Sequence, residues 1–266
     1  MHLPLIRIAT AAAAALAMSV PAAVAAPANQ ATIDIDDQNM TANGFAAGSG
    51  WTRVTINADR PVDFGIVALK PGKDTGGFAN AIGKLSPDRT ESWGDWVAGG
   101  STRPGAPYVV ALDMDPAWYS VIVYERKKQY QVGGFSVFDR PGGFEEPAST
   151  STIGLRDFRF DTPRTLDAGG TLKVVNQGRQ IHELVLARVK GKPAAAVKLA
   201  KQGKFGKIRF AGQPSQAVGL VSGGTTNVVT PELAKGRYLL VCAYGDARSR
   251  NKPHATLGMA QAITVR

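Results

Sequence analysis

The sequence predicts an all-β protein made of two tandem antiparallel β-sandwiches. Short strand-like runs recur along the chain and are separated by turn residues, which is typical of sandwich folds. The same order of runs appears in both halves of the chain, which indicates a diverged internal duplication. A stretch rich in Pro, Gly, Ser and Thr at residues 141–152 lies between the two sets and has the composition of a linker.

The N-terminal segment has the composition of a secretory signal peptide. Arg7 supplies a positive charge, residues 5–20 are apolar and rich in Ala, and Ala23-Val24-Ala25 fits a cleavage site. We therefore expect residues 1–25 to be a signal peptide and the protein to be secreted or located in the periplasm or cell envelope. The apolar stretch is short for a membrane span, and no later stretch approaches its length, so no transmembrane anchor is expected.

The first half, residues 26–140, is expected to form one sandwich. Its strand-like runs are at residues 51–56, 62–69, 108–112, 118–124 and 133–138. A Gly-rich excursion over residues 70–83 follows the second run, and Gly99-Gly100 precedes the third. Short strands with Gly-rich connections favour a small β domain.

The second half, residues 153–266, repeats this order. Its strand-like runs are at residues 171–175, 182–188, 226–230, 237–243 and 258–265, with a short helix expected at 194–201 and a Gly-rich turn at 222–224. The run 238–242 is apolar on both alternating faces, so we expect it to be buried on both sides, with Cys242 at its end. Asn57 then corresponds to Asn176, and Tyr119 corresponds to Tyr238.

Charge is distributed unevenly between the halves. Residues 28–146 carry 11 Lys and Arg against 15 Asp and Glu, a net charge of −4, whereas residues 147–266 carry 19 against 6, a net charge of +13. A basic half could dock an acidic redox partner or an anionic envelope surface, or it could be a solvated surface without a partner. No nucleic-acid-binding motif is present, and the expected export argues against such a partner.

The side chains that bind soft metals are few and are concentrated in the second half. Cys242 is the only cysteine, and His182 and His254 are the only histidines after the expected leader. Met259 follows His254 closely. Imidazole, thiolate and thioether together are the ligands of electron-transfer copper sites. Zinc accepts Cys and His as well, and the Met favours copper. Taken singly, each residue also has a purely structural explanation, such as a buried cysteine or a core methionine.

The second half resembles the cupredoxins, the plastocyanin and azurin family of small Greek-key copper proteins. The resemblance rests on the run Val-Val-Asn-Gln-Gly-Arg-Gln-Ile-His at residues 174–182 and on the late order Cys242, His254, Met259. It implies a Greek-key β-sandwich with one copper per chain, held by His182 and those three residues. Asn176 is expected either to support the ligands by hydrogen bonding or only to form the turn.

A weaker version of the resemblance, without ligands, covers about residues 31–139. By the same register Asp63 falls opposite His182, and Val123 falls opposite Cys242. The first half contains no histidine. We therefore expect it to be a cupredoxin-like sandwich that binds no metal.

The second half departs from the family in the loop between Cys242 and His254. Family loops hold only a few residues there, whereas residues 243–253 number eleven. The loop is polar and turn-prone. It could project outward and return at Pro253, which would leave His254 beside Cys242, or it could place His254 elsewhere.

The resemblance implies an exported one-electron carrier or another copper-binding protein. Copper storage or delivery uses the same ligands and stays open as an alternative. A metal-free binding or adhesion module is the second alternative. Multicopper oxidases and copper nitrite reductases need further histidines for a second copper centre, so we expect no enzyme. Hydrolytic catalysis is also not expected, because no G-x-S-x-G element is present.

Overall fold

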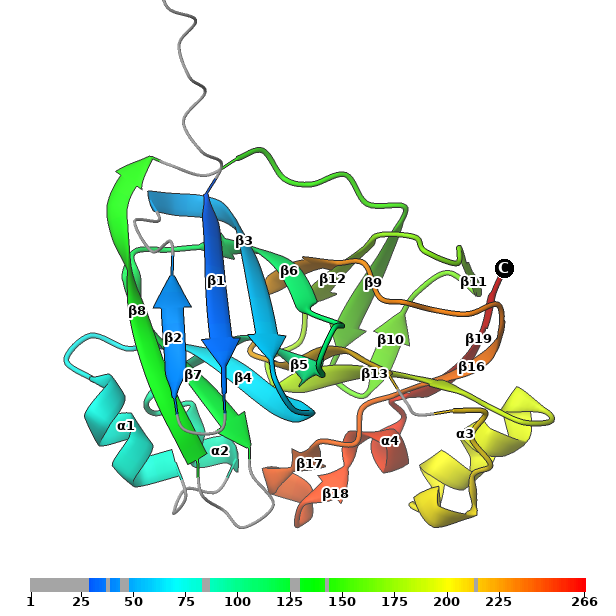
Figure 1. The fold of residues 1–266 in the computed structure, drawn as a ribbon. Helices are drawn as coiled ribbons and strands as arrows, with labels where there is room; N and C mark the ends of the chain where they lie inside the picture. Colours follow the sequence, from blue (N-terminus) through cyan, green and yellow to red (C-terminus); the bar gives the residue numbers. More distant parts are fainter. Residues whose placement is uncertain are drawn as a thin grey trace, which may run out of the picture.

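The structure is a computed structural model, and it describes residues 29–36, 39–43, 48–82, 87–124, 130–141, 144–212 and 215–266. The expected signal peptide lies outside these residues. The described chain is mostly β-strand, as the sequence predicted, and it forms β-sandwiches (Figure 1). No described helix is long and apolar enough to cross a membrane.

The strands of the first half form two layers. In chain order they are β1 (Gln30–Ile35), β2 (Met40–Asn43), β3 (Gly48–Ala58), β4 (Val62–Leu69), β5 (Gly94–Thr102), β6 (Tyr108–Met114), β7 (Ala117–Tyr124) and β8 (Tyr130–Pro141). One layer pairs β1 with β3 and β3 with β6, and the other has the order β8-β7-β4-β5. A short parallel pairing between β3 and β8 joins the two layers.

The second half repeats this arrangement. Its strands are β9 (Ser151–Arg156), β10 (Arg159–Asp161), β11 (Thr165–Leu166), β12 (Leu172–Asn176), β13 (His182–Arg188), β14 (Ser215–Val221), β15 (Thr226–Val229), β16 (Gly236–Val241), β17 (Gly245–Asp246), β18 (Lys252–Pro253) and β19 (Ala260–Val265). One layer has the order β10-β9-β12-β15, and the other has the order β11-β19-β16-β13-β14. The parallel pair β9–β12 corresponds to the pair β1–β3.

In the described part of the chain, helices are few and lie outside the sheets. They are α1 (Thr75–Ile82), α2 (Pro87–Thr90), α3 (Pro193–Lys201) and α4 (His254–Leu257), with 3-10 turns η1 (Phe205–Lys207) and η2 (Ala247–Ser249). The expected helix at 194–201 is confirmed as α3. The Gly-rich excursion at 70–83 contains a helix that was not expected, α1, which buries Phe78 and Ile82.

The two halves correspond to one another in the order and pairing of their strands. They are joined by antiparallel pairing of β6 with β15, in which Val110 lies opposite Val229. These two residues are 119 positions apart, as are Tyr119 and Tyr238. Both tyrosine hydroxyls donate a hydrogen bond to the carbonyl oxygen four residues earlier, over 2.8 Å and 2.7 Å. Topology and local detail therefore both support an internal duplication.

The halves are also packed together. One hydrophobic cluster runs from Ala31 in the first half to Val265 in the second. β5 and β14 touch at Gly219, where an added Cβ would lie 2.6 Å from the carbonyl carbon of Gly99. The expected linker 141–152 begins at the end of β8 and ends inside β9. The division into domains at 26–140 and 153–266 stays a prediction.

Candidate metal centre

The predicted ligands lie at the end of two neighbouring strands. His182 is the first residue of β13, and Cys242 directly follows β16. These strands pair in antiparallel register, with Val185 opposite Val241, so their adjacent ends bring His182 and Cys242 together. His254 opens the short helix α4, whose Ala255 N–H donates to the carbonyl oxygen of Cys242 over 2.9 Å. Backbone pairing alone thus gathers the three side chains.

The donor atoms converge at distances that suit one metal ion. Nδ1 of His182 lies 3.0 Å from Nδ1 of His254, and Sγ of Cys242 lies 3.5 Å from the same His254 nitrogen. One ligand atom from each of the three residues lies within 4.8 Å of the others. Metal–nitrogen bonds of about 2.0 Å and metal–sulfur bonds of about 2.3 Å at tetrahedral angles separate donors by roughly 3.3 Å and 3.5 Å. The cluster therefore fits a single copper ion.

The cluster is closed to water. His182 and Cys242 are 0% exposed and His254 is 1% exposed. Burial lowers the pKa of His182 to about 4, helped by repulsion from His254 and opposed by Asp157. Burial also lowers the pKa of His254. Both imidazoles are therefore neutral at pH 7, the form that binds a metal.

Burial raises the pKa of the Cys242 thiol well above its ordinary value, and the charge of Glu183 raises it further. The backbone N–H of Glu183 donates to Sγ over 3.5 Å. The Glu183 carboxylate accepts the N–H of Ala243 over 2.7 Å, which ties the two strand ends together. Because a thiolate is the metal-binding form, metal binding must release the thiol proton.

The backbone of Met259 is hydrogen-bonded to two of the other predicted ligands, His254 and Cys242. Its N–H donates to the carbonyl oxygen of His254 over 3.0 Å, and its carbonyl oxygen accepts the N–H of Cys242 over 3.2 Å. The side chain is fully buried in the same hydrophobic cluster as Cys242. Its role as a fourth, axial ligand stays a prediction.

The long loop projects outward and returns at Pro253, the first of the two outcomes considered from the sequence. β17 and β18 form a small hairpin with Gly245 opposite Pro253 (Figure 1). The buried Asp246 carboxylate caps η2 by accepting the N–H of Arg248 over 3.2 Å, and the His254 N–H donates to the Tyr244 carbonyl oxygen over 2.8 Å. The eleven-residue loop therefore leaves His254 beside Cys242.

Asn176 does not touch the ligands but shapes the approach to His182. Its Nδ2 donates to the carbonyl oxygens of Gln180 and Val221, both over 2.8 Å. Its Oδ1 accepts the N–H of Gly178 over 2.9 Å. These hydrogen bonds form the turn and hold the segment that delivers His182, whereas a supporting role of Asn176 toward a bound metal stays a prediction.

Some residues at the site were not foreseen from the sequence, and two of them contact the histidines from one turn. Asp157 and Phe158 form the two-residue turn between β9 and β10, with Arg156 opposite Arg159. Asp157 Oδ1 lies 3.2 Å from Nε2 of His182. The Phe158 ring meets the His254 ring edge to face, with centroids 5.6 Å apart.

The first half has no matching cluster among its described residues. Asp63, opposite His182 in the duplicated register, is exposed and hydrogen-bonds Ser101. Val123, opposite Cys242, is buried. Within the described residues, the group His182, Cys242 and His254 alone meets the spacing of a metal site built from His, Cys, Asp or Glu.

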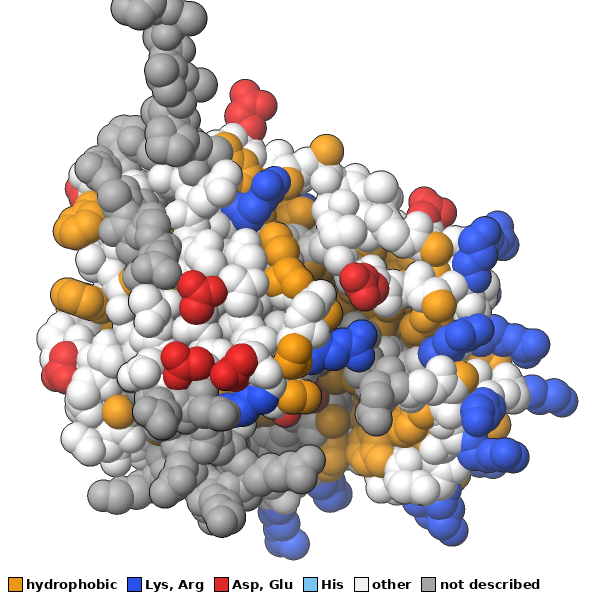
Figure 2. Space-filling model, viewed as in Figure 1, with side chains coloured by type: hydrophobic (Ala, Val, Ile, Leu, Met, Phe, Trp, Pro, Cys, Tyr) orange, Lys and Arg blue, Asp and Glu red, His pale blue; other side chains and the backbone are white. Residues whose placement is uncertain are grey.

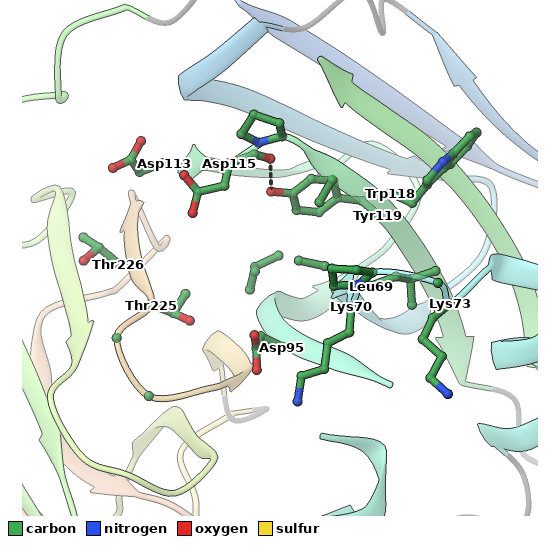
Figure 3. A pocket seen from close by; sticks show the side chains of 18 residues that line it. Leu69, Lys70, Lys73, Asp95, Asp113, Asp115, Trp118, Tyr119, Thr225 and Thr226 are labelled. Carbon is green, nitrogen blue, oxygen red and sulfur yellow. Dashed lines mark hydrogen bonds between the residues drawn. The ribbon is translucent and has the colours of Figure 1, made fainter. Parts of the chain in front are cut away.

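A cavity of about 670 Å³ lies between the halves and does not include the cluster. Figure 3 shows Asp95, Asp113 and Asp115 of the first half around it, together with Thr225 and Thr226 of the second. Two lysines lie on its wall. Lys70 donates a hydrogen bond to the Glu91 carbonyl oxygen, and the Lys73 ammonium lies over the Trp93 ring. The cavity is a polar cleft at the junction, and among the described residues it holds no group of His, Cys, Asp or Glu side chains at the spacing of a metal site.

No protein-family model and no curated protein sequence matches the chain. Among solved structures, auracyanin from Roseiflexus castenholzii is similar over 45% of this chain and 99% of its own, with 21% identity and a TM-score of 0.27. Auracyanin A, a blue copper protein from Chloroflexus aurantiacus, is similar over 43% and 96%, with 24% identity and a TM-score of 0.27. A multicopper oxidase is similar over 89% and 88%, with 10% identity and a TM-score of 0.25.

Because these TM-scores are low, the cluster of His182, Cys242 and His254, and not these neighbours, indicates a metal centre. This β-sandwich gathers one histidine and one cysteine at the ends of adjacent strands and a second histidine at the start of a short helix, and it is cupredoxin-like. This is the fold that the sequence resemblance implied, and its His–Cys–His cluster fits one copper.

Proposed function

We propose that this protein is an exported one-electron carrier with one type 1-like copper site in its second half. Its ligands are His182, Cys242 and His254, with Met259 as the axial ligand. The observation that supports this most strongly is the convergence of two neutral imidazole nitrogens and one sulfur in a dry pocket. Copper held by such a set accepts and releases a single electron.

The chain's own residues suit this role by holding the donors still. Backbone pairing fixes the ends of β13 and β16, and the Glu183 carboxylate links them. The N–H of Glu183 supports the sulfur, and Asn176 supports the segment before His182. A rigid site that excludes water changes little between oxidation states, and this favours fast electron exchange.

We propose a carrier rather than an enzyme. Both histidines of the second half are used by one cluster, and none remains for a second copper centre. The basic second half is proposed to dock an acidic redox partner or an anionic envelope surface. Export by the N-terminal segment and the two-domain division belong to the same proposal.

Copper storage or delivery is the second candidate, and one observation favours it. The described ligands leave no imidazole edge open to solvent, since His254 is only 1% exposed. Voltammetry of the copper-loaded protein separates the two candidates. A carrier gives a reversible one-electron wave with fast exchange, whereas a store gives tight Cu(I) binding and slow exchange.

The first test is a Cu(II) titration of the purified mature protein, followed by visible absorption. We expect an intense thiolate-to-copper charge-transfer band that saturates at one copper per chain. The Cys242→Ala variant should lack the band. A wild-type protein without the band, or with copper bound equally well by the variant, would contradict the proposal.

A further inference from the structure

The turn between β9 and β10 reaches the metal centre from the opposite sheet. β10 and β9 form the edge of the large sheet, whereas His182 lies in the five-stranded sheet and Cys242 directly follows one of its strands. The turn consists of Asp157 and Phe158 alone, and it contacts both histidines. Phe158 has a positive φ of 65°, a left-handed conformation that is unfavourable for a residue with a Cβ. The strained backbone at this turn points to a role for its side chains.

The Asp157 carboxylate is held in place before it meets the imidazole. Its Oδ1 accepts the N–H of Arg179 over 3.0 Å and the N–H of Gln180 over 3.3 Å, besides lying 3.2 Å from Nε2 of His182. These two backbone donors come from the segment that delivers His182. The oxygen is therefore fixed with respect to the ring.

The space for this contact depends on Gly178. A Cβ there would lie 2.4 Å from Oδ1 of Asp157 and 2.9 Å from Nε2 of His182. Both distances are shorter than real Cβ contacts allow. The chain thus carries its smallest residue at the point where a side chain would separate the carboxylate from the imidazole.

We propose that Asp157 is a positioning residue for the metal site, an inference that rests on the copper function proposed above. A carboxylate at Nε2 requires the proton of a neutral His182 to sit on that nitrogen. Nδ1 then carries the lone pair, and Nδ1 is the nitrogen that faces His254 and the cluster. The negative charge also makes the imidazole a stronger donor, which stabilises Cu(II) more than Cu(I).

Three variants and two controls test this inference in the full mature chain. Asp157→Asn keeps an acceptor oxygen and removes the charge, whereas Asp157→Ala removes both. Gly178→Ala keeps the carboxylate but forces it away from the ring. Asp161→Asn removes a 64% exposed carboxylate four residues away, and Gly206→Ala adds a methyl group where nothing lies within 4 Å.

The copper-loaded proteins are compared by reduction potential and by Cu(II) affinity. We expect Asp157→Asn to lower the preference for Cu(II) over Cu(I) about tenfold, which raises the potential by about 59 mV. Asp157→Ala and Gly178→Ala should each lower Cu(II) affinity by roughly 10–100-fold. Both controls should match the wild type.

A second measurement needs no copper. Imidazole ¹⁵N shifts of the metal-free protein should show the proton of wild-type His182 on Nε2, and a mixture of both tautomers in Asp157→Ala. If the wild type lacks the charge-transfer band, the copper proposal fails. The contact between Asp157 and His182 is still tested, because the tautomer is measured without copper. If the tautomer, the potential and the affinity of the Asp157 variants all match those of Asp161→Asn, the positioning role is wrong.

Discussion

His182 and His254 are two basic side chains that the fold holds neutral and in contact. Their Nδ1 atoms are 3.0 Å apart, so protonating both would place two positive charges side by side in a dry pocket. Burial lowers the pKa of His182 to about 4 and also lowers that of His254. In the metal-free protein this pair is therefore a source of instability in acid.

The stability of the metal-free protein should fall as the pH drops from about 6.5 to 4. Within this range the unfolded chain binds protons on its histidines while the folded chain does not, so protonation favours unfolding. The shift at His182 alone corresponds to about 3 kcal/mol. Thermal unfolding at a series of pH values measures it.

The matched variant for this prediction is His182→Gln. It removes the titrating group and the repulsion with His254, so its melting temperature should depend less on pH than that of the wild type. Equal pH dependence in the two proteins would show that other groups govern acid unfolding.

At the scale of elements, the loop between Cys242 and His254 decides whether a site forms at all. The site can form because β17 and β18 pair in antiparallel register, with Asp246 opposite Lys252, and this pairing brings the two ends of the loop together. Asp246 is buried and caps η2, and its Oδ1 lies 3.4 Å from Nε2 of Gln180 in the segment before His182. One carboxylate thus joins the loop to the opposite side of the site.

Asp246→Ala should loosen this hairpin. Losing a helix cap costs about 0.5–2 kcal/mol, and His254 follows the hairpin directly, so copper should dissociate faster as well. Chemical denaturation and the rate of copper transfer to a chelator measure the two effects. Asp167→Ala, at an exposed turn residue, is the control and should change neither; equal effects in both variants would rule out a specific role for the cap.

Periodic elements could be predicted from the sequence, and the elements that depend on distant contacts could not. The run 182–188 matches β13 because it is a largely apolar stretch that turn residues bound. β5 was missed because Gly99 and Gly100 lie inside it, where close approach of β14 requires small residues. The three residues of the cluster, His182, Cys242 and His254, could be singled out from their rarity and order. Asp157 and Phe158 could not, since nothing local marks Phe as a residue with positive φ.

For the whole molecule, the two halves have similar strand arrangements and net charges of opposite sign. Figure 2 shows Lys and Arg side chains gathered mainly over the side that carries α3, and Asp and Glu mainly over the side that carries β1 and β2. α3 ends in basic residues, among them the exposed Lys198 and Lys201. It packs against α4, which begins with His254. The positive surface is therefore close to the metal centre.

This placement predicts that electron exchange depends on the sign of the reactant's charge. A small anionic oxidant should react with the copper-loaded protein more slowly as salt rises, because ions screen attraction beyond about 10 Å at 0.1 M. A cationic oxidant should show the opposite trend, and stopped-flow absorption at several ionic strengths measures both. The double variant Lys198→Glu with Lys201→Glu should flatten the dependence for the anion. If rates with both oxidants are independent of salt, the basic surface is only a solvated face, and docking must rest on other contacts.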